Sequence, residues 1–328
     1  MAALDPAKLA QAVLAGDGRA LARAITLAES TRPDHRDAAE AVAALALPRG
    51  EAALRLGITG APGVGKSTFI DAFGRVLIAG GHKVAVLAVD PSSKRGGGAL
   101  LGDKTRMPEL AKSPHAFIRP SPSGNRPGGV ARRTREAIVL AAAAGFDRVI
   151  VETVGVGQSE TEIAEMVDLF VLLIAPGGGD ELQGLKRGVL ELADLVVVTK
   201  ADGDLAPASQ RAVADYAHAL RLVRPHDTPD VLAVSALEGR HVDAVAAALE
   251  RQAQRLAASG EREQRRARQA EAAFWREIGD TLSDALKDDG RLASLLPQLR
   301  EKVAAGTLLP ATAARHAVAA FLAPAGLP

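Results

Sequence analysis

The clearest chemical signal in the sequence is an eight-residue run, Gly60-Ala61-Pro62-Gly63-Val64-Gly65-Lys66-Ser67. It has the spacing of a P-loop, whose glycines let successive backbone N–H groups point at phosphate oxygens. The following helix adds the partial positive charge of its N-terminus. Lys66 would reach the β- and γ-phosphates, and Ser67 would hold Mg²⁺. We therefore expect phosphate contacts along the whole run and at the next residue: Gly60, Ala61, Pro62, Gly63, Val64, Gly65, Lys66, Ser67 and Thr68.

A second motif, Thr199-Lys200-Ala201-Asp202, indicates which base is bound. Guanine presents two N–H donors on one edge, and the Asp202 carboxylate can accept both. Adenine offers a lone pair there, which would leave a desolvated carboxylate unpaired at a cost of several kcal/mol. The aliphatic stem of Lys200 can lie along the base. Thr199 stands where such motifs usually have Asn, so weaker bracing hydrogen bonds are expected.

A third segment, Ser235-Ala236-Leu237, follows the next apolar strand, where GTPases place a backbone N–H against guanine O6. With the second motif it favours GTP over ATP, although a solvated acid at a strand end is the plain alternative for Asp202.

Three acidic residues are candidates for the metal and for catalysis. Asp90 and Glu152 each end an apolar strand, at the sheet edge where ligands bind, and Asp103 lies in a long loop. Mg²⁺ is usually shared among one or two carboxylates, a hydroxyl and phosphates, so direct and water-mediated contacts are expected. A helix cap or a surface ion pair remains the alternative for each. The Gly155 N–H could bond the γ-phosphate, and Gln158 could orient the attacking water.

The elements that must hold these residues alternate between short apolar runs and helical stretches. The runs are 54–59, 84–89, 149–151, 169–175, 195–199 and 231–235, which predicts a mostly parallel α/β sheet flanked by helices. Residues 90–129, rich in Gly, Pro and Ser, are expected to form one long functional loop.

Both ends of the chain have helical patterns. Residues 1–48 predict two or three short helices, with Asp17 and Asp34 as N-caps. No strand pattern appears after about residue 238. The charged stretch 252–276 is interpreted as a solvated helical face rather than a nucleic-acid patch, because its charges alternate in sign. The predicted regions are an N-terminal helical extension (1–48), a P-loop domain (49–258) and C-terminal helices (259–328) that would pack on a second copy of the chain.

Composition narrows the function further. The 328 residues carry a net charge of +1, 3% aromatics and no cysteine. These values argue against nucleic-acid binding and exclude thiolate metal sites and disulfides. The longest apolar run, 137–144, is too short to span a membrane, and Asp5 and Lys8 do not suit a secretory signal. We expect a cytoplasmic protein with no membrane partner.

Together, further segments resemble the MeaB/ArgK/MMAA family of P-loop GTPases. They are Asp90-Pro91-Ser92-Ser93, Leu101-Gly102-Asp103-Lys104-Thr105-Arg106-Met107, Phe117-Ile118-Arg119-Pro120-Ser121-Pro122-Ser123, residues 152–160 and Gly179-Asp180-Glu181-Leu182-Gln183-Gly184. The likeness extends from the N-terminal helices to at least Ser235, and Asn125-Arg126-Pro127 departs from it.

The resemblance implies a homodimer that binds GTP, GDP and Mg²⁺ and serves as chaperone to an adenosylcobalamin-dependent acyl-CoA mutase. Methylmalonyl-CoA mutase is the usual client, and isobutyryl-CoA and ethylmalonyl-CoA mutases are alternatives. The GTPase would gate cofactor loading and protect the mutase, with the C-terminal helices forming the dimer arm. Residues 177–186 resemble an additional switch in which Asp180, Glu181 and Lys186 take part.

Slow intrinsic hydrolysis is expected, because the resemblance provides no obvious arginine finger in cis. Four arginines near the switch region are candidates, namely Arg106, Arg119, Arg132 and Arg133. The rival functions are a nickel metallochaperone GTPase, which needs clustered Cys or His, a P-loop small-molecule kinase, a transport-associated ATPase or kinase, and a purely structural dimer.

Overall fold

The computed structural model describes residues 5–30, 32–90, 106–122, 129–153, 159–177 and 187–323. The chain divides into two compact units, Met1–Gln269 and Ala270–Pro328. The first unit holds the sheet and both nucleotide motifs, so it is the part that positions the site.

Three helices precede the sheet: α1 (Pro6–Leu14), α2 (Gly18–Glu29) and α3 (Pro33–Gly50). The predicted N-cap Asp17 is confirmed, because its carboxylate accepts from the backbone N–H groups of Arg19 and Ala20. Asp34 is not an N-cap. It lies in the first turn of α3 behind Pro33, where its carboxylate pairs with Arg32 at 2.7 Å. Proline is favoured at the first helical position, and α3 starts two residues earlier than an N-cap at Asp34 would place it.

The sheet has seven strands in the order β3-β2-β4-β1-β5-β6-β7, and every pairing is parallel. The strands are β1 (Leu54–Gly60), β2 (Val84–Asp90), β3 (Ala116–Pro122), β4 (Arg148–Thr153), β5 (Leu169–Ile174), β6 (Leu195–Val198) and β7 (Asp230–Ala233). β1 lies between β4 and β5, so the loop that follows it opens at the centre of the sheet's carboxyl edge. The predicted α/β class and parallel sheet are confirmed.

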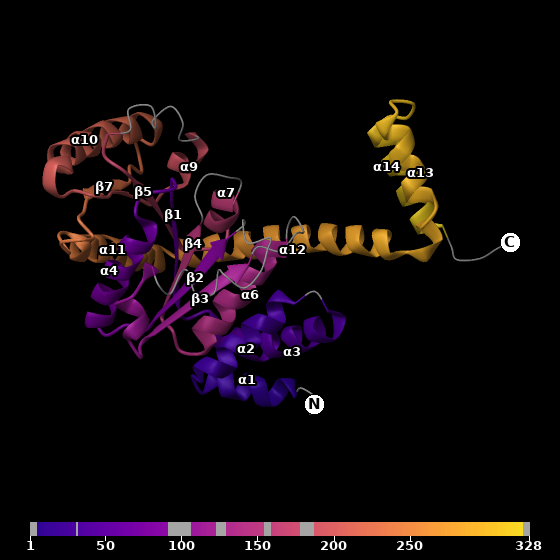
Figure 1. Ribbon diagram of the computed structural model, residues 1–328, viewed down its shortest axis with the longest axis horizontal. Coiled ribbons are helices and arrows are strands. Elements are labelled where there is room, and N and C mark those ends of the chain that lie inside the picture. The colour runs from indigo at the N-terminus through magenta and orange to yellow at the C-terminus, as the bar shows by residue number, and fades with distance from the viewer. Residues whose placement is uncertain are drawn as a thin grey trace. The chain divides into compact units, whose positions relative to one another are not determined.

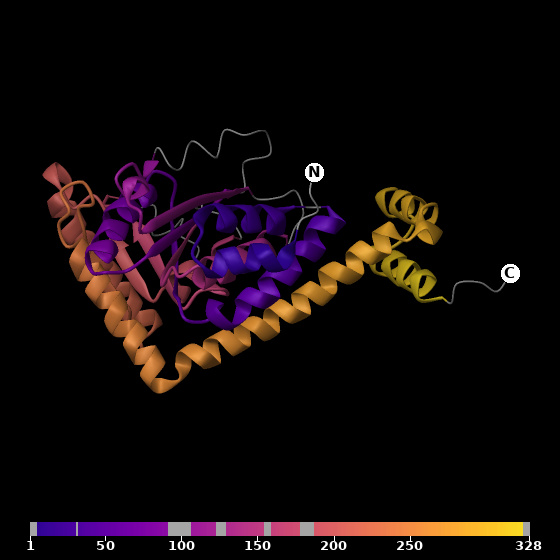
Figure 2. The ribbon, with the colours of Figure 1, turned by 90° about the horizontal axis from the view of Figure 1, so that it is seen from below.

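Helices cover both faces of the sheet (Figure 1). On one face α4 (Lys66–Ala79) and α11 (Val242–Ser259) share a core with the strands, centred on Phe69 and Phe73. On the other face α6 (Gly129–Ala143), α7 (Ser159–Ala164), α9 (Arg187–Leu192) and α10 (Ala206–Val223) pack on the strands. α2 and α3 lie against α6, as Figures 1 and 2 show, and form a further layer. The N-terminal helices are therefore part of the same core as the sheet.

The expectation of one long loop over residues 90–129 is wrong. β3 and a 3-10 helix, η1 (Leu110–Lys112), lie within it. β3 holds Pro120 and Pro122. Proline has no backbone N–H to donate, so it is rare in inner strands, which form hydrogen bonds with a neighbour on each side. β3 is an edge strand that pairs only with β2, so the missing donors cost little.

A buried acid on α4 holds the segment that leads to β3. Asp71 Oδ1 accepts from the backbone N–H groups of Glu109 at 3.1 Å and Leu110 at 2.9 Å. The Leu110 side chain packs so closely on α4 that a Cβ at Gly74 would lie 2.7 Å from it. This segment is therefore fixed to the helix that begins at the P-loop.

We expect Asp71→Ala to lower the free energy of unfolding by about 2 kcal/mol, because it leaves two backbone donors without their acceptor. Asp71→Asn keeps an acceptor oxygen at the same place and should cost less than about 1 kcal/mol. Urea unfolding of both variants measures the difference. Equal losses would show that Oδ1 does not hold the segment.

The interpretation of residues 252–276 as a solvated face is wrong for two arginines at the start of α12 (Glu261–Asp288). Arg266 binds the fully buried Asp168 at 2.6 Å, and Arg265 binds Asp194 at 3.0 Å. Both acids directly precede a strand of the sheet. Alternating charge alone could not reveal these partners, because they lie about 70 to 100 residues away in sequence.

The second unit, Ala270–Pro328, contains the remainder of α12, then α13 (Leu295–Ala304) and α14 (Pro310–Leu322). Its small core consists of Leu299, Ala313 and Ala317. The helical character expected after residue 238 is confirmed for the described residues. Across the described parts of both units, no helix combines the length and apolar character needed to cross a bilayer.

Candidate functional site

The loop between β1 and α4 has a backbone that requires glycine. Gly60 has φ 155°, and a Cβ there would lie 2.4 Å from the carbonyl oxygen of Leu173. Gly65 has φ 97° at the N-cap of α4, where no side chain caps the helix. The first N–H groups of α4 therefore lack a capping side chain, which suits an anion at this end of the helix. The strand, loop and helix predicted around the motif are all present.

Lys66 lies over this loop rather than in solvent. Its Nζ donates to the carbonyl oxygens of Gly60 at 2.8 Å and Ala61 at 3.1 Å, and the residue is only 9% exposed. Burial lowers the pKa of Lys66, while the carboxylates of Glu152 and Glu160 act in the opposite direction. A buried ammonium with two neutral acceptors gains further from an anion, so the lysine is poised for phosphate.

Ser67 and Glu152 meet at the carboxyl edge of the sheet. Ser67 Oγ donates to Glu152 Oε1 at 3.1 Å, and Glu152 is buried near the end of β4. Beside them the hydroxyls of Thr59 and Thr153 share a hydrogen bond of 2.7 Å, which ties the ends of β1 and β4 together. The structure thus brings two of the predicted metal ligands together.

This pair of donors fits Mg²⁺, which prefers hard oxygen ligands and is commonly held by few protein groups together with phosphates and water. Among the described residues, no three His, Cys, Asp or Glu side chains gather closely enough to bind a metal by themselves. Ser67 and Glu152 would hold Mg²⁺, which would supply positive charge at the phosphates.

Thr199 connects the base motif to the P-loop. Its buried Oγ1 lies 2.7 Å from the carbonyl oxygen of Val64 and 3.1 Å from that of Ile174, and the hydroxyl donates toward both. A threonine stands here where such motifs usually have Asn, and its hydroxyl makes a short hydrogen bond to the loop. That this bracing is weaker than that of Asn stays a prediction.

We expect Thr199→Val, which keeps the shape and removes the hydroxyl, to weaken GTP binding about fivefold to tenfold, since one buried hydrogen bond contributes about 1 to 1.5 kcal/mol. Thr199→Ser restores the donor and should bind GTP within about twofold of the unmodified chain. Calorimetric titration of both variants tests this. Wild-type affinity in Thr199→Val would show that the link does not position the loop.

Asp202 is held by Ser235 from the next strand end. Ser235 Oγ donates to Asp202 Oδ2 at 2.5 Å and accepts from the backbone N–H of Glu238 at 3.1 Å. Asp202 is partly buried, and Ser235 is fully buried. The two base motifs, predicted from separate strand ends, therefore lie together and fix one oxygen of the carboxylate.

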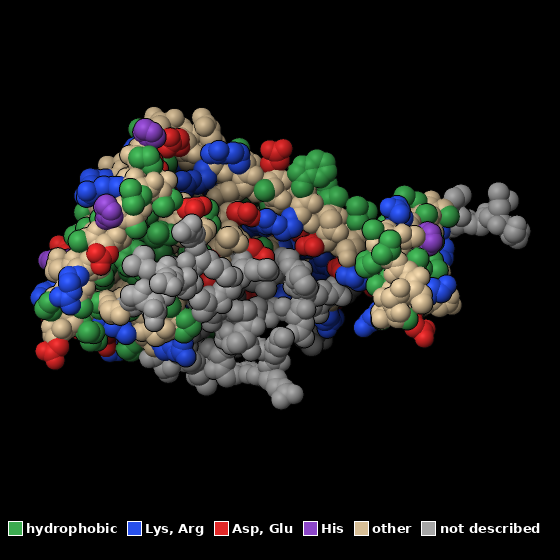
Figure 3. Space-filling view, turned by 90° about the horizontal axis from the view of Figure 1, so that it is seen from above, with side chains coloured by type: hydrophobic (Ala, Val, Ile, Leu, Met, Phe, Trp, Pro, Cys, Tyr) green, Lys and Arg blue, Asp and Glu red, His purple; other side chains and the backbone are tan. Residues whose placement is uncertain are grey.

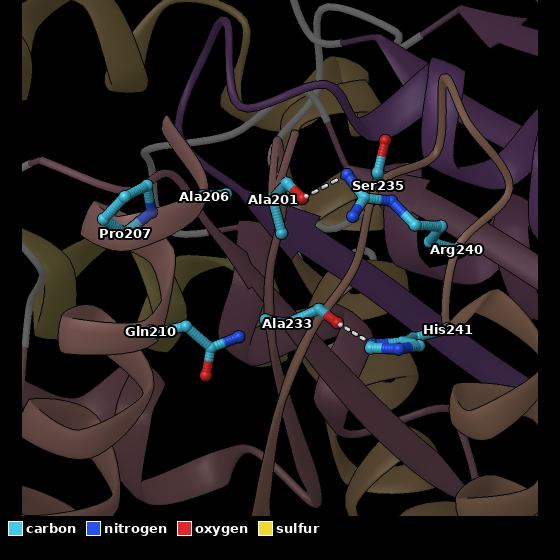
Figure 4. Close-up of a pocket in the computed structure, with 8 residues that line it drawn as sticks. All are labelled: Ala201, Ala206, Pro207, Gln210, Ala233, Ser235, Arg240 and His241. Atoms are coloured by element: carbon cyan, nitrogen blue, oxygen red, sulfur yellow. Dashed lines mark hydrogen bonds between the residues drawn. The ribbon is translucent and has the colours of Figure 1, made fainter. Parts of the chain in front are cut away.

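The side chains of Arg240 and His241 contact the backbone at the ends of β6 and β7, next to the base motifs (Figure 4). The Arg240 guanidinium donates to the carbonyl oxygen of Ala201 at 3.2 Å, and His241 Nδ1 lies 3.3 Å from that of Ala233. A cavity of about 260 Å³ lies between these residues and the start of α10. Sequence reasoning missed Arg240, because a side chain that binds a neighbouring backbone leaves no spacing signal.

The remaining base-motif residues have different surroundings. Lys200 has φ 55°, a conformation uncommon outside glycine, and its side chain is exposed. Ala236 is partly buried and Leu237 is 79% exposed. Residues in such uncommon backbone conformations are often found at ligand sites.

Several predicted residues lie outside the described residues: Asp103, Gly155, Gln158, Asp180, Glu181, Lys186 and the departure at 125–127. Asp90 ends β2 at the same edge as Glu152, and nothing is stated about its side chain. One acid that sequence reasoning did not assign is Glu160, which is buried in α7 and whose charge raises the pKa of Lys66. Its position two residues after Gln158 was the sequence feature that could have marked it as a site residue.

The family model described as Methylmalonyl Co-A mutase-associated GTPase MeaB matches residues 21–291. A Caulobacter vibrioides protein named "Putative GTPase" is 52% identical over 322 residues, covering 97% of this chain and 98% of its own. The mitochondrial methylmalonic aciduria type A homolog of Mus musculus is 43% identical, covering 96% of this chain and 79% of its own. A crystal structure of a LAO/AO transport system kinase superposes with a TM-score of 0.76 at 37% identity, covering 98% of this chain and 99% of the other.

Proposed function

The chain belongs to the MeaB family of methylmalonyl Co-A mutase-associated GTPases. From this premise we propose that it couples GTP hydrolysis to the cofactor loading and protection of an acyl-CoA mutase. It binds GTP with Mg²⁺ and hydrolyses it to GDP and phosphate. Its client is an adenosylcobalamin-dependent mutase, with methylmalonyl-CoA mutase the first to test. The nucleotide state gates cofactor loading and protects the client from inactivation.

One observation carries the GTPase part of the proposal. The Thr199 hydroxyl binds the P-loop carbonyl of Val64, while Ser235 holds Asp202 three residues further along the same motif. The four-residue segment Thr199–Asp202 thereby connects the P-loop to an acid suited to guanine. This arrangement supports a guanine nucleotide whose phosphates lie at Lys66 and Ser67.

In this proposal Lys66 neutralises the β- and γ-phosphates, and Ser67 and Glu152 hold Mg²⁺ with Asp90 and Asp103. Gly155 senses the γ-phosphate, and Gln158 orients the attacking water. Asp180, Glu181 and Lys186 pass the nucleotide state to the client. Charges of both signs are interspersed over the described part of the face seen in Figure 3, so that part offers no broad basic surface, and the proposal assigns the phosphates to this local set.

The C-terminal helices form a homodimer in this proposal. Along α12, Phe274 and Trp275 are 59% and 64% exposed, with their rings in edge-to-face contact 5.6 Å apart. Adjacent exposed aromatic side chains are typical of protein contacts. Sedimentation of the full chain tests this, and a monomer at micromolar concentration would contradict it.

The experiment for the coupled function measures GTP turnover by the purified chain with and without each candidate mutase. We expect slow hydrolysis alone and at least a tenfold rise with the true client, because a partner that completes the charge around the phosphates contributes up to about 10³ to 10⁵ in rate. Loading of adenosylcobalamin into the mutase should depend on GTP. If turnover by the chain is unchanged by all three mutases, the client part of the proposal is wrong while the GTPase part stands.

A further inference from the structure

The loop between β7 and α11, called here the base loop (residues 235–240), is closed by its last residue. It begins after Val234 and leads to Val242, and both valines are fully buried in the core of the sheet. The backbone N–H of Ser235 donates to the carbonyl oxygen of Arg240 at 3.1 Å, which bridges the loop in antiparallel fashion. The base loop therefore has fixed ends, and Arg240 stands at the point where it closes.

The same arginine reaches the other base motif. Ala201 lies between Lys200 and Asp202, the two residues assigned to the base. Its backbone N–H donates to the carbonyl oxygen of Val234 at 2.9 Å. Its carbonyl oxygen accepts from the Arg240 guanidinium at 3.2 Å, as Figure 4 shows. Both backbone polar groups of Ala201 are thus held by residues that flank the third sequence motif.

Arg240 has little to contribute to folding itself. Its side chain is 52% exposed and pairs at 2.5 Å with Glu238, which is 50% exposed. Exposed ion pairs add little to stability, because water and salt screen the two charges. The hydrogen bond to Ala201 acts locally instead, on the backbone one residue before Asp202. Loss of Arg240 should therefore leave the fold intact and release this piece of backbone.

Guanine recognition needs groups from two strand ends to keep a fixed spacing. Asp202, after β6, would accept the two N–H donors of guanine, and the backbone of the base loop, after β7, would donate to O6. These three groups lie on one edge of the base, so acceptor and donor must face it together. The hydrogen bond from Ser235 to Asp202 fixes a carboxylate oxygen at 2.5 Å, and the one from Arg240 fixes the backbone beside it.

We propose that Arg240 is a positioning residue for guanine, which sets the spacing between Asp202 and the base loop by holding the carbonyl group of Ala201. This inference rests on the proposed GTPase function and deepens it. Arg240 acts at the base end of the site, whereas the phosphates are assigned to Lys66 and Ser67. Its loss should therefore change which base is preferred and leave the chemical step unchanged.

The test is Arg240→Ala, measured by GTP and ATP affinity and by steady-state hydrolysis of GTP. We expect the preference for GTP over ATP to fall about fivefold, since one hydrogen bond that aligns the guanine contacts is lost. KM for GTP should rise by a similar factor, and kcat should stay within about twofold, because the phosphate contacts are unchanged. The ratio of the two affinities is measured on one sample, so a partly unfolded preparation does not alter it.

Two further variants make the test specific. Arg240→Lys keeps a long side chain with a charged donor and should recover at least about half of the lost preference for GTP. Arg255→Ala removes another half-exposed arginine from α11, where it pairs with Asp227 at 3.7 Å. This control should match the unmodified chain in both affinities and in turnover.

The outcomes separate the two proposals. If the unmodified chain does not prefer GTP, the proposed function itself fails. If it prefers GTP and Arg240→Ala keeps that preference, Arg240 does not position the base, and the GTPase function stands. The same conclusion follows if Arg240→Ala weakens GTP and ATP equally, because a general loosening of the site would do so. An Arg240→Lys variant no better than Arg240→Ala would overturn the role of the donor.

Discussion

Asp202→Asn should weaken GTP binding by about 10² to 10³, because guanine then faces a neutral amide whose NH₂ group opposes one of its own donors. The same change should favour xanthosine triphosphate. Xanthine has a carbonyl where guanine has its amino group, and the asparagine NH₂ can donate to it while its oxygen accepts the ring N–H. Competitive titration with both nucleotides measures the switch.

The matched control is Asp204→Asn, which makes the same charge change at an exposed acid two residues away. GTP affinity in this variant should stay within about twofold, since a solvated carboxylate contributes little at this distance. Retained GTP preference in Asp202→Asn would show that another group reads the base. Equal losses in the two variants would point to charge rather than hydrogen bonding.

Lys66→Met should lower GTP hydrolysis by at least about 10², because it removes a buried positive charge next to the phosphates, where water cannot replace it. Methionine has a similar length and fills the same space without the charge. The loss should appear in the rate at saturating GTP as well as in affinity. Lys83→Met, which changes an exposed lysine, is the control and should hydrolyse GTP normally.

The same substitution should not destabilise the nucleotide-free protein. The pKa of Lys66 is lowered chiefly by burial, so the folded chain holds this proton less tightly than the unfolded chain does. Stability from this group therefore rises with pH from the lowered pKa up to the usual value of about 10.4, and below that interval the buried charge is a cost. Urea unfolding at pH 7 should give Lys66→Met a free energy of unfolding no lower than that of the unmodified chain. A clear loss would mean that the Lys66 hydrogen bonds to Gly60 and Ala61 outweigh the cost of burial.

Local patterns were enough to predict the centre of the site. The spacing of residues 60–67 and the strand that precedes them determine a loop whose backbone needs glycine, and the structure has positive φ at Gly60, Gly63 and Gly65. The apolar run 195–199 similarly placed Thr199–Asp202 at a strand end. These features depend on neighbours in sequence, so sequence reasoning reached them.

Contacts between distant residues could not be predicted in the same way. β3 was missed because its prolines indicate a loop unless the strand is known to lie at an edge. Asp71 gives no signal of its bonds to Glu109 and Leu110, 38 and 39 residues away.

The most direct test of guanine recognition is calorimetric titration of the unmodified chain, in the presence of Mg²⁺, with a non-hydrolysable GTP analogue and with the matching ATP analogue. The account predicts that the guanine analogue binds at least about a hundredfold more tightly, since a carboxylate facing the wrong base edge is left desolvated and unpaired. Equal affinity for the two analogues would contradict it.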